Sequence, residues 1–116
     1  MASNLNSIGV NLNATGGAIT AQEVFRVPNG HMAKVTMFFL SNTGGSTCTV
    51  GAKWWDGATI PFLGSKSLSA GSYVQFGGGE GLYMMMHQDD YITVSVSNGG
   101  LCGLILSYEL IRADSQ

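Results

Sequence analysis

The stretch from Gln88 to Leu110 constrains the fold of this chain more than any other segment. From Tyr91 to Ser97, apolar residues alternate with hydroxyl-bearing residues, and this period of two predicts a strand with one buried face. The turn signal Asn98-Gly99-Gly100 follows, and a second run then places apolar residues at one parity, namely Cys102, Leu104, Leu106, Tyr108 and Leu110. Two such runs around an Asn-Gly turn predict a β-hairpin. A lone hairpin is marginal in water, so the remaining chain must supply more sheet.

The rest of the chain repeats this pattern of short apolar runs separated by turn residues. The expected strands cover residues 8–12, 18–27, 31–40, 48–55, 59–63, 67–76 and 82–86, together with the two strands of the hairpin. No segment combines a helical period with helix caps. The pattern therefore predicts an all-β protein, an antiparallel β-sandwich of eight or nine short strands that is jelly-roll-like or immunoglobulin-like.

Three of the expected strands carry positional signals. Imperfect alternation in residues 18–27 predicts a bulge or an edge strand. Pro61 confines residues 59–63 to an edge, because proline cannot donate to a strand ladder. Residues 31–40 place Ala33, Val35, Met37 and Phe39 on one side, and their other side also becomes apolar towards the end. This strand is therefore expected in the middle of the fold.

With 116 residues, the chain is expected to form one domain. We assign residues 1–17 to an extended N-terminal arm, 18–111 to the sandwich and 112–116 to a polar tail. Within the arm, one apolar stripe is formed by Ile8, Val10 and Leu12. This stripe either adds a strand to a neighbouring subunit or caps its own sheet as an edge strand.

Charged residues make up 10% of the chain, against about 25% in typical soluble domains. Such a surface repels copies of itself weakly, which favours a protein that assembles over a compact monomer with hydroxyl-coated strands. The five basic residues are scattered, which argues against nucleic acid as a partner. No apolar run is long enough to span a membrane, and the first residues do not resemble a signal peptide, so synthesis in a cytoplasm is expected.

The sequence offers little catalytic chemistry. Asp89 and Asp90 are interpreted as a turn that starts a strand, and neighbours on a strand would point to opposite faces, so they are poorly placed to share a proton. His87 and Asp89 have a metal-binding spacing but lack a second histidine downstream. Cys48 and Cys102 are expected to be buried free thiols, with a disulfide as the alternative. We therefore predict no catalytic residue, no metal and no cofactor.

Surface aromatic and methionine side chains are the better candidates for function. Trp54 continues the apolar stripe of its strand, so Trp55 points to the other face and is expected to be at least partly exposed. Trp55 is interpreted as a subunit anchor, as a sugar-stacking platform together with Tyr83, or as part of a second core. Met85 faces away from Met84 and Met86, which favours a subunit contact.

Three segments together resemble a known class of proteins. They are SNTGGSTCTVGAKWWDG (41–57), SLSAGSYVQFGGGEGLYMMMHQDDYITVSVS (67–97) and GLILSYELI (103–111). Their order resembles small β-sandwich virion proteins of tailed bacteriophages, which include head decoration (cement) proteins and head–tail or fibre adaptors. In that class the penultimate strand commonly begins Gly-Asp-x-Ile-x-Val, and here Asp89 takes the place of the glycine before Asp90.

The resemblance implies a non-enzymatic structural protein located in the virion. It implies a capsid decoration protein that self-associates as a homotrimer and binds the major capsid protein or other virion subunits. A tail or head–tail adaptor is the alternative within the same class, and a carbohydrate-binding sandwich is the alternative outside it. The interface candidates are then the stripe of Ile8, Val10 and Leu12 together with Trp55, Tyr83 and Met85.

Overall fold

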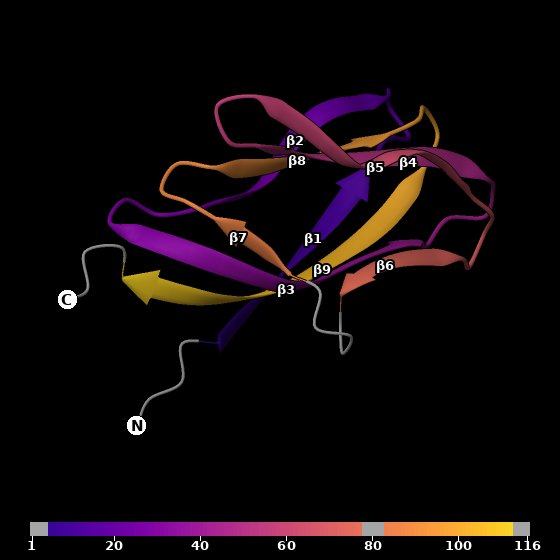
Figure 1. Ribbon diagram of the computed structural model, residues 1–116. Helices are drawn as coiled ribbons and strands as arrows, with labels where there is room; N and C mark the ends of the chain where they lie inside the picture. The colour runs from indigo at the N-terminus through magenta and orange to yellow at the C-terminus, as the bar shows by residue number, and fades with distance from the viewer. Residues whose placement is uncertain (1–4, 78–82, 113–116) are drawn as a thin grey trace.

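The computed structural model describes residues 5–77 and 83–112, which form two antiparallel sheets packed face to face (Figure 1). Sheet A contains, in spatial order, β1 (Leu5–Asn13), β9 (Leu101–Arg112), β3 (His31–Asn42) and β6 (Tyr73–Gly77), and β7 (Met84–Met86) also pairs with β3. Sheet B contains, in spatial order, β2 (Ile19–Arg26), β8 (Tyr91–Val96), β4 (Cys48–Trp55) and β5 (Thr59–Leu68). The predicted all-β sandwich is confirmed.

Strand pairing is nested along the chain. β1 pairs with β9, β2 pairs with β8, β3 pairs with β6 and β7, and β4 pairs with β5. The chain thus forms one long antiparallel two-stranded ribbon whose turn lies between β4 and β5. Successive pairs of this ribbon alternate between sheet A and sheet B. This arrangement is a jelly roll, which decides between the two sandwich types expected from the sequence.

The core lies between the two sheets and follows the predicted alternation. Ile92, Val94 and Val96 of β8 are buried, as are Leu104 and Leu106 of β9 on the opposite sheet. Each such side chain is worth about 1.5–3 kcal/mol when it is fully removed from water. Burial of these two stripes against each other is therefore the main source of sandwich stability.

The predicted hairpin of β8 and β9 is wrong, because the two strands belong to different sheets. Gly99 has a φ of 92°, as the Asn-Gly signal requires. The next residue, Gly100, is buried where an added Cβ would lie 2.7 Å from Val96 Cγ1 and 2.9 Å from Cys48 Cβ. Only glycine fits this passage without a shift of its neighbours, and the chain uses it to cross from sheet B to sheet A.

Strand β3 is central, as predicted, but its buried face changes partway along. The register with β9 shifts between Val35 and Met37, which is a β-bulge. Beyond the bulge, Phe38 and Leu40 are buried, and Phe39 turns outward. The predicted common side of Ala33, Val35, Met37 and Phe39 is therefore broken at the bulge, because Ala33 and Val35 face the core whereas Phe39 does not.

The predicted N-terminal arm is part of the sandwich from residue 5 onward. β1 pairs with β9 without a register break from Leu5 to Asn13. Leu12 is buried, and Ile8 and Val10 pack partly buried against the core. The alternative of an edge strand that caps its own sheet is correct, whereas residues 1–4 and 113–116 of the predicted arm and tail lie outside the described residues.

Two further edge predictions are confirmed and one boundary is corrected. β5, with Pro61, is an edge strand of sheet B, and β2 is an edge strand with two register shifts. The strand expected within 67–76 is entered through the turn Ser69-Ala70-Gly71, as predicted, in which Ser72 N donates to Ser69 O at 2.9 Å, and its boundary moves to Tyr73 because residues 67 and 68 belong to β5. Gly71 in this turn has a φ of 81°, which favours glycine.

Candidate functional site

The described residues offer two broad surfaces, the outer faces of the two sheets. Across 5–77 and 83–112, no helix has the length and apolar character needed to cross a membrane. Within the same ranges, no group of three or more His, Cys, Asp or Glu side chains is placed to hold a metal ion. The two outer faces differ in chemistry, and the face of sheet A is the candidate functional site.

Exposed apolar side chains gather on the outer face of sheet A. Ile105 of β9 is 47% exposed, and Tyr73 of β6 is 59% exposed. Phe39 of β3 lies between them in the sheet order, and its ring stacks on Tyr73 with 4.9 Å between centroids and 26° between planes. These three residues, which we call the apolar patch, lie on adjacent strands and are contributed by a rigid sheet.

A groove of about 350 Å³ runs beside this apolar patch. Gly9 stands opposite Ile105 in the register, and Ile105 stands opposite Phe39. Gly103, one pair further along, likewise has no side chain to fill the surface. The glycines therefore leave a hollow whose walls are the side chains of Ile105 and Phe39.

The other end of the same face is apolar with one charge of each sign. Leu5, Glu109, Lys34 and Met85 follow one another across β1, β9, β3 and β7 in register. Leu5 is exposed, and the Lys34 Nζ lies 4.7 Å from the centroid of the exposed Tyr83 ring. Lys34 and Glu109 are register partners of opposite charge, so this row adds little net charge to the face.

The outer face of sheet B carries a closed stack instead. Arg26, Tyr91 and Trp55 are register partners on β2, β8 and β4. The Tyr91 ring stacks on Trp55 at 5.1 Å and 11°, and the Arg26 guanidinium lies 4.6 Å from the centroid of the Tyr91 ring. Both faces of the Tyr91 ring are therefore in contact with another side chain.

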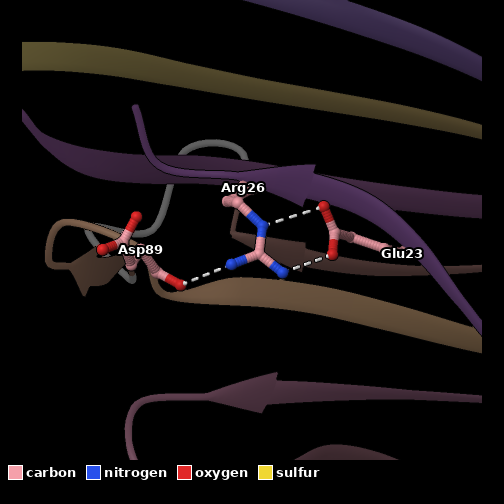
Figure 2. A network of polar contacts seen from close by, with 3 residues as sticks. All are labelled: Glu23, Arg26 and Asp89. Carbon is pink, nitrogen blue, oxygen red and sulfur yellow. Dashed lines mark hydrogen bonds and ion pairs between the residues drawn. The ribbon is translucent and has the colours of Figure 1, made fainter. Parts of the chain in front are cut away.

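Arg26 is itself held by three hydrogen bonds to two residues (Figure 2). Its Nη2 and Nε donate to the Glu23 carboxylate at 2.7 and 3.1 Å, and its Nη1 donates to the Asp89 carbonyl oxygen at 3.4 Å. The hydrogen bond from Arg26 lowers the pKa of Glu23, and the same bond raises the pKa of Arg26. The Arg26 guanidinium therefore stays charged, and its hydrogen bonds hold it over the face of the Tyr91 ring opposite Trp55.

Polar residues cover the remainder of sheet B. Lys53 and Thr93 are register partners next to the stack, and Ser95 and Gly51 are the pair that follows. A groove of about 230 Å³ is lined by these residues and by β5 near Pro61. With Glu23 and Arg26, this face carries more charge and fewer apolar groups than the face of sheet A.

The acidic pair is a structural feature of the turn before β8. Asp90 is 6% exposed, and its Oδ2 accepts hydrogen bonds from Trp54 Nε1 at 3.2 Å and from the His87 backbone N at 2.9 Å. Asp89 has a φ of 71°, in the region where glycine is most comfortable. The turn therefore keeps the geometry that a Gly-Asp sequence would favour, and Trp54 packs against the core with its indole N–H satisfied.

The two cysteines are buried free thiols, as predicted. Their Sγ atoms lie 3.7 Å apart, with Cys48 on sheet B and Cys102 on sheet A. Burial raises the pKa of the Cys102 thiol to about 12. Because the thiolate is the nucleophile, Cys102 is inert at neutral pH and serves as a small core residue.

The structure separates the predicted interface residues into three places. Tyr83 and Met85 lie on the outer face of sheet A, and Trp55 lies on the outer face of sheet B. The stripe of Ile8, Val10 and Leu12 faces the core at the β1 edge. Sequence reasoning missed the apolar patch itself. Ile105 was detectable, because it is an apolar residue at the outward parity of its strand.

No protein-family model matches the chain, and no curated protein matches it.

Proposed function

We propose that this protein is a non-enzymatic structural subunit of a tailed-phage virion, a capsid decoration protein that docks on other virion subunits through the outer face of sheet A. One observation carries the proposal. Among the described residues, that face presents the apolar patch of Ile105, Phe39 and Tyr73, and its charged side chains are the opposed pair Lys34 and Glu109.

The chemistry of the face supports docking on protein. Interface centres are depleted in charge and enriched in aromatic side chains, and a few central residues supply most of the binding energy. Tyr73 and Ile105 each leave about half of their surface exposed to water in the isolated chain, so covering them would release bound water favourably. The hollow beside Ile105 offers a partner side chain a place to insert.

The resemblance of residues 41–57, 67–97 and 103–111 to phage virion proteins supplies the class and the location. The turn at Asp89 supports it, because the residue at the position of the motif glycine adopts a φ of 71°. A position at the tail or the head–tail junction is the alternative within the class, and the docking face would serve there equally.

Carbohydrate binding has less support. A sugar platform needs an aromatic ring with an open face, whereas the Trp55 ring stacks on Tyr91 and the Lys34 Nζ lies 4.7 Å from the centroid of the Tyr83 ring. Tyr83 and Trp55 belong to different sheets, so they do not form the joint platform considered from the sequence. The outer face of sheet A therefore remains the stronger candidate.

The test uses virions of the phage that encodes this chain, grown with its gene deleted. Purified wild-type protein is expected to co-sediment with these particles. The Ile105→Lys variant, which places a charge in the apolar patch, is expected to stay in the supernatant. Thr49→Lys is the matched control, because it places the same charge on an exposed site of sheet B and is expected to bind normally. Wild-type protein that fails to bind, or is absent from native virions by mass spectrometry, would refute the proposal.

A further inference from the structure

The sheet edges formed by the described residues are protected to very different degrees. β2 carries two register shifts and the charges of Glu23 and Arg26, and β5 carries Pro61, Lys66 and register shifts of its own. β6 and β7 are five and three residues long. Bulges, charge, proline and short length are the devices by which natural sheets block pairing with another chain.

The edge strand β1 has none of these devices. It is nine residues long, LNSIGVNLN, with no charged residue and no proline from Leu5 to Asn13. Its register with β9 is continuous over its whole length. An edge that is long, regular and uncharged is a template for strand addition.

The alternation of hydrogen-bonded pairs between β1 and β9 shows which backbone groups of β1 point away from the sheet. Ala14 N donates to Gly100 O at 2.8 Å, and Thr43 N donates to Leu101 O at 2.9 Å on the other side of β9. Pairs in an antiparallel ladder alternate, so even-numbered residues of β1 bond to β9 and odd-numbered residues point away. The free edge therefore presents the N–H and C=O groups of Ser7, Gly9 and Asn11.

We propose that a second copy of this chain pairs with β1, antiparallel and centred on Gly9, so that sheet A continues across a two-fold axis. This inference deepens the proposed function, because it names how copies of the docking subunit associate. It replaces the homotrimer implied by the resemblance with a dimer formed through strand addition.

The side chains of β1 complement their own copy in this register. Gly9 stands opposite Gly9 of the second copy, so the centre is free of steric conflict. Ile8 stands opposite Val10 of the second copy on the core side, which forms two cross-strand pairs of β-branched residues. Ile8 and Val10 are only partly buried in the single chain, and the second copy would cover them at the open end of the core.

The two-fold axis of such a pair runs perpendicular to sheet A. Both copies then present their outer faces in the same direction, and one dimer offers two apolar patches to one partner surface. Two linked contacts bind far more tightly than one when both sites can be reached together. The edge contact and the docking face are thus separate surfaces that act together.

The first test removes one outward hydrogen-bond donor. Gly9→Pro deletes an N–H that does not bond to β9, whereas Gly9→Ala retains it and places its Cβ no closer than 3.9 Å to Leu104 O. In sedimentation equilibrium, wild-type protein and Gly9→Ala are expected to reach twice the 12.2 kDa chain mass. Gly9→Pro is expected to dissociate at least about tenfold more readily, with circular dichroism confirming its fold. A wild-type monomer or trimer at the highest soluble concentration would overturn the proposal.

The second test measures which residues of the two β1 strands lie opposite each other, and it needs no proline substitution. Gly9→Cys is expected to form a disulfide-linked dimer under mild copper-phenanthroline oxidation, because directly opposed residues lie about 5.5 Å apart at Cα. Ser7→Cys is the matched control, since its own copy would lie about 14 Å away along the strand. Cys48 and Cys102 are buried and take no part. Equal cross-linking of both variants, or of neither, would contradict a pair centred on Gly9.

The two proposals fail separately. If Gly9→Pro loses the dimer while Ile105→Lys remains dimeric, the contact through β1 is supported. This result holds whether or not the protein binds virions. A protein that binds particles as a monomer would retain the docking face and exclude strand addition through β1.

Discussion

Two aromatic stacks occupy the two outer faces of the sandwich, and they differ in how their rings are covered. On sheet A, Tyr73 stacks on Phe39 and is 59% exposed. On sheet B, Tyr91 lies between Trp55 and the Arg26 guanidinium, and Arg26 is fixed by Glu23. The first stack is open to a partner, and the second is closed by its own chain.

The difference shows that an outward aromatic side chain does not by itself mark an interface. Tyr91 has a cation on one side and an indole on the other, so its ring contacts are already made within the subunit. Tyr73, at the outer strand β6, has one ring neighbour among the described residues. Neighbouring residues in register, rather than residue type, determine which stack is available for binding.

The largest effect on binding is expected from the open stack. Tyr73→Ala should weaken docking on virion particles by about 2 kcal/mol or more, close to thirtyfold, because an exposed aromatic anchor is lost. Its unfolding free energy should change by less than about 0.5 kcal/mol, since the side chain lies at the surface. A co-sedimentation isotherm and urea unfolding on the same preparation measure both quantities. A Tyr73→Ala protein that loses stability but docks normally would show that this stack supports the fold and does not bind the partner.

The matched change in the closed stack should produce the opposite result. Tyr91→Ala removes a ring that contacts Trp55 and Arg26, and we expect the unfolding free energy to fall by about 2 kcal/mol. Docking of the folded fraction should be unchanged. Urea unfolding followed by tryptophan fluorescence is the measurement, because Trp55 loses its stacking partner. A stable Tyr91→Ala protein that no longer docks would show that sheet B is the interface.

A smaller, stabilising effect is expected at the turn beside the closed stack. Asp89→Gly relieves a left-handed φ of 71° and should stabilise the fold by about 0.5–1 kcal/mol. The Asp89 carbonyl that accepts from Arg26 belongs to the backbone and is retained. A rise in the thermal midpoint with unchanged docking is the expected outcome. A fall in the midpoint would show that the Asp89 carboxylate contributes more than the backbone strain costs.

Local alternation was sufficient to predict most of the fold. The period of two in β8 and β9 identified the buried stripes, and Pro61 identified an edge strand. The connection between β8 and β9 was harder to predict, because an Asn-Gly turn supplies positive φ angles both to a hairpin and to a crossing between sheets. The steric demand at Gly100 distinguishes them, and it arises from Val96 and Cys48 in three dimensions.

The candidate site was less predictable than the fold for a related reason. Ile105 breaks the parity of its strand and was detectable from the sequence. The sequence pattern placed Phe39 on the same side of its strand as Ala33 and Val35, because the bulge between Val35 and Met37 depends on the register with β9 and not on local sequence. The stacking of Phe39 on Tyr73 joins strands that are distant along the chain, and no periodicity reports such a contact.

The smallest effect is expected in the core that lies between the two faces. Cys48 and Cys102 are free thiols on opposite sheets, and burial raises the pKa of Cys102 to about 12, which keeps this thiol protonated and slow to oxidise. Dithiothreitol should therefore leave the thermal midpoint of the wild-type protein unchanged. A native disulfide would instead contribute about 2–5 kcal/mol, and its reduction would lower the midpoint by about ten degrees. Such a drop would mean that a covalent link between the sheets supports both faces, and the separate stabilities inferred from Tyr73 and Tyr91 would then need to be measured again in the reduced protein.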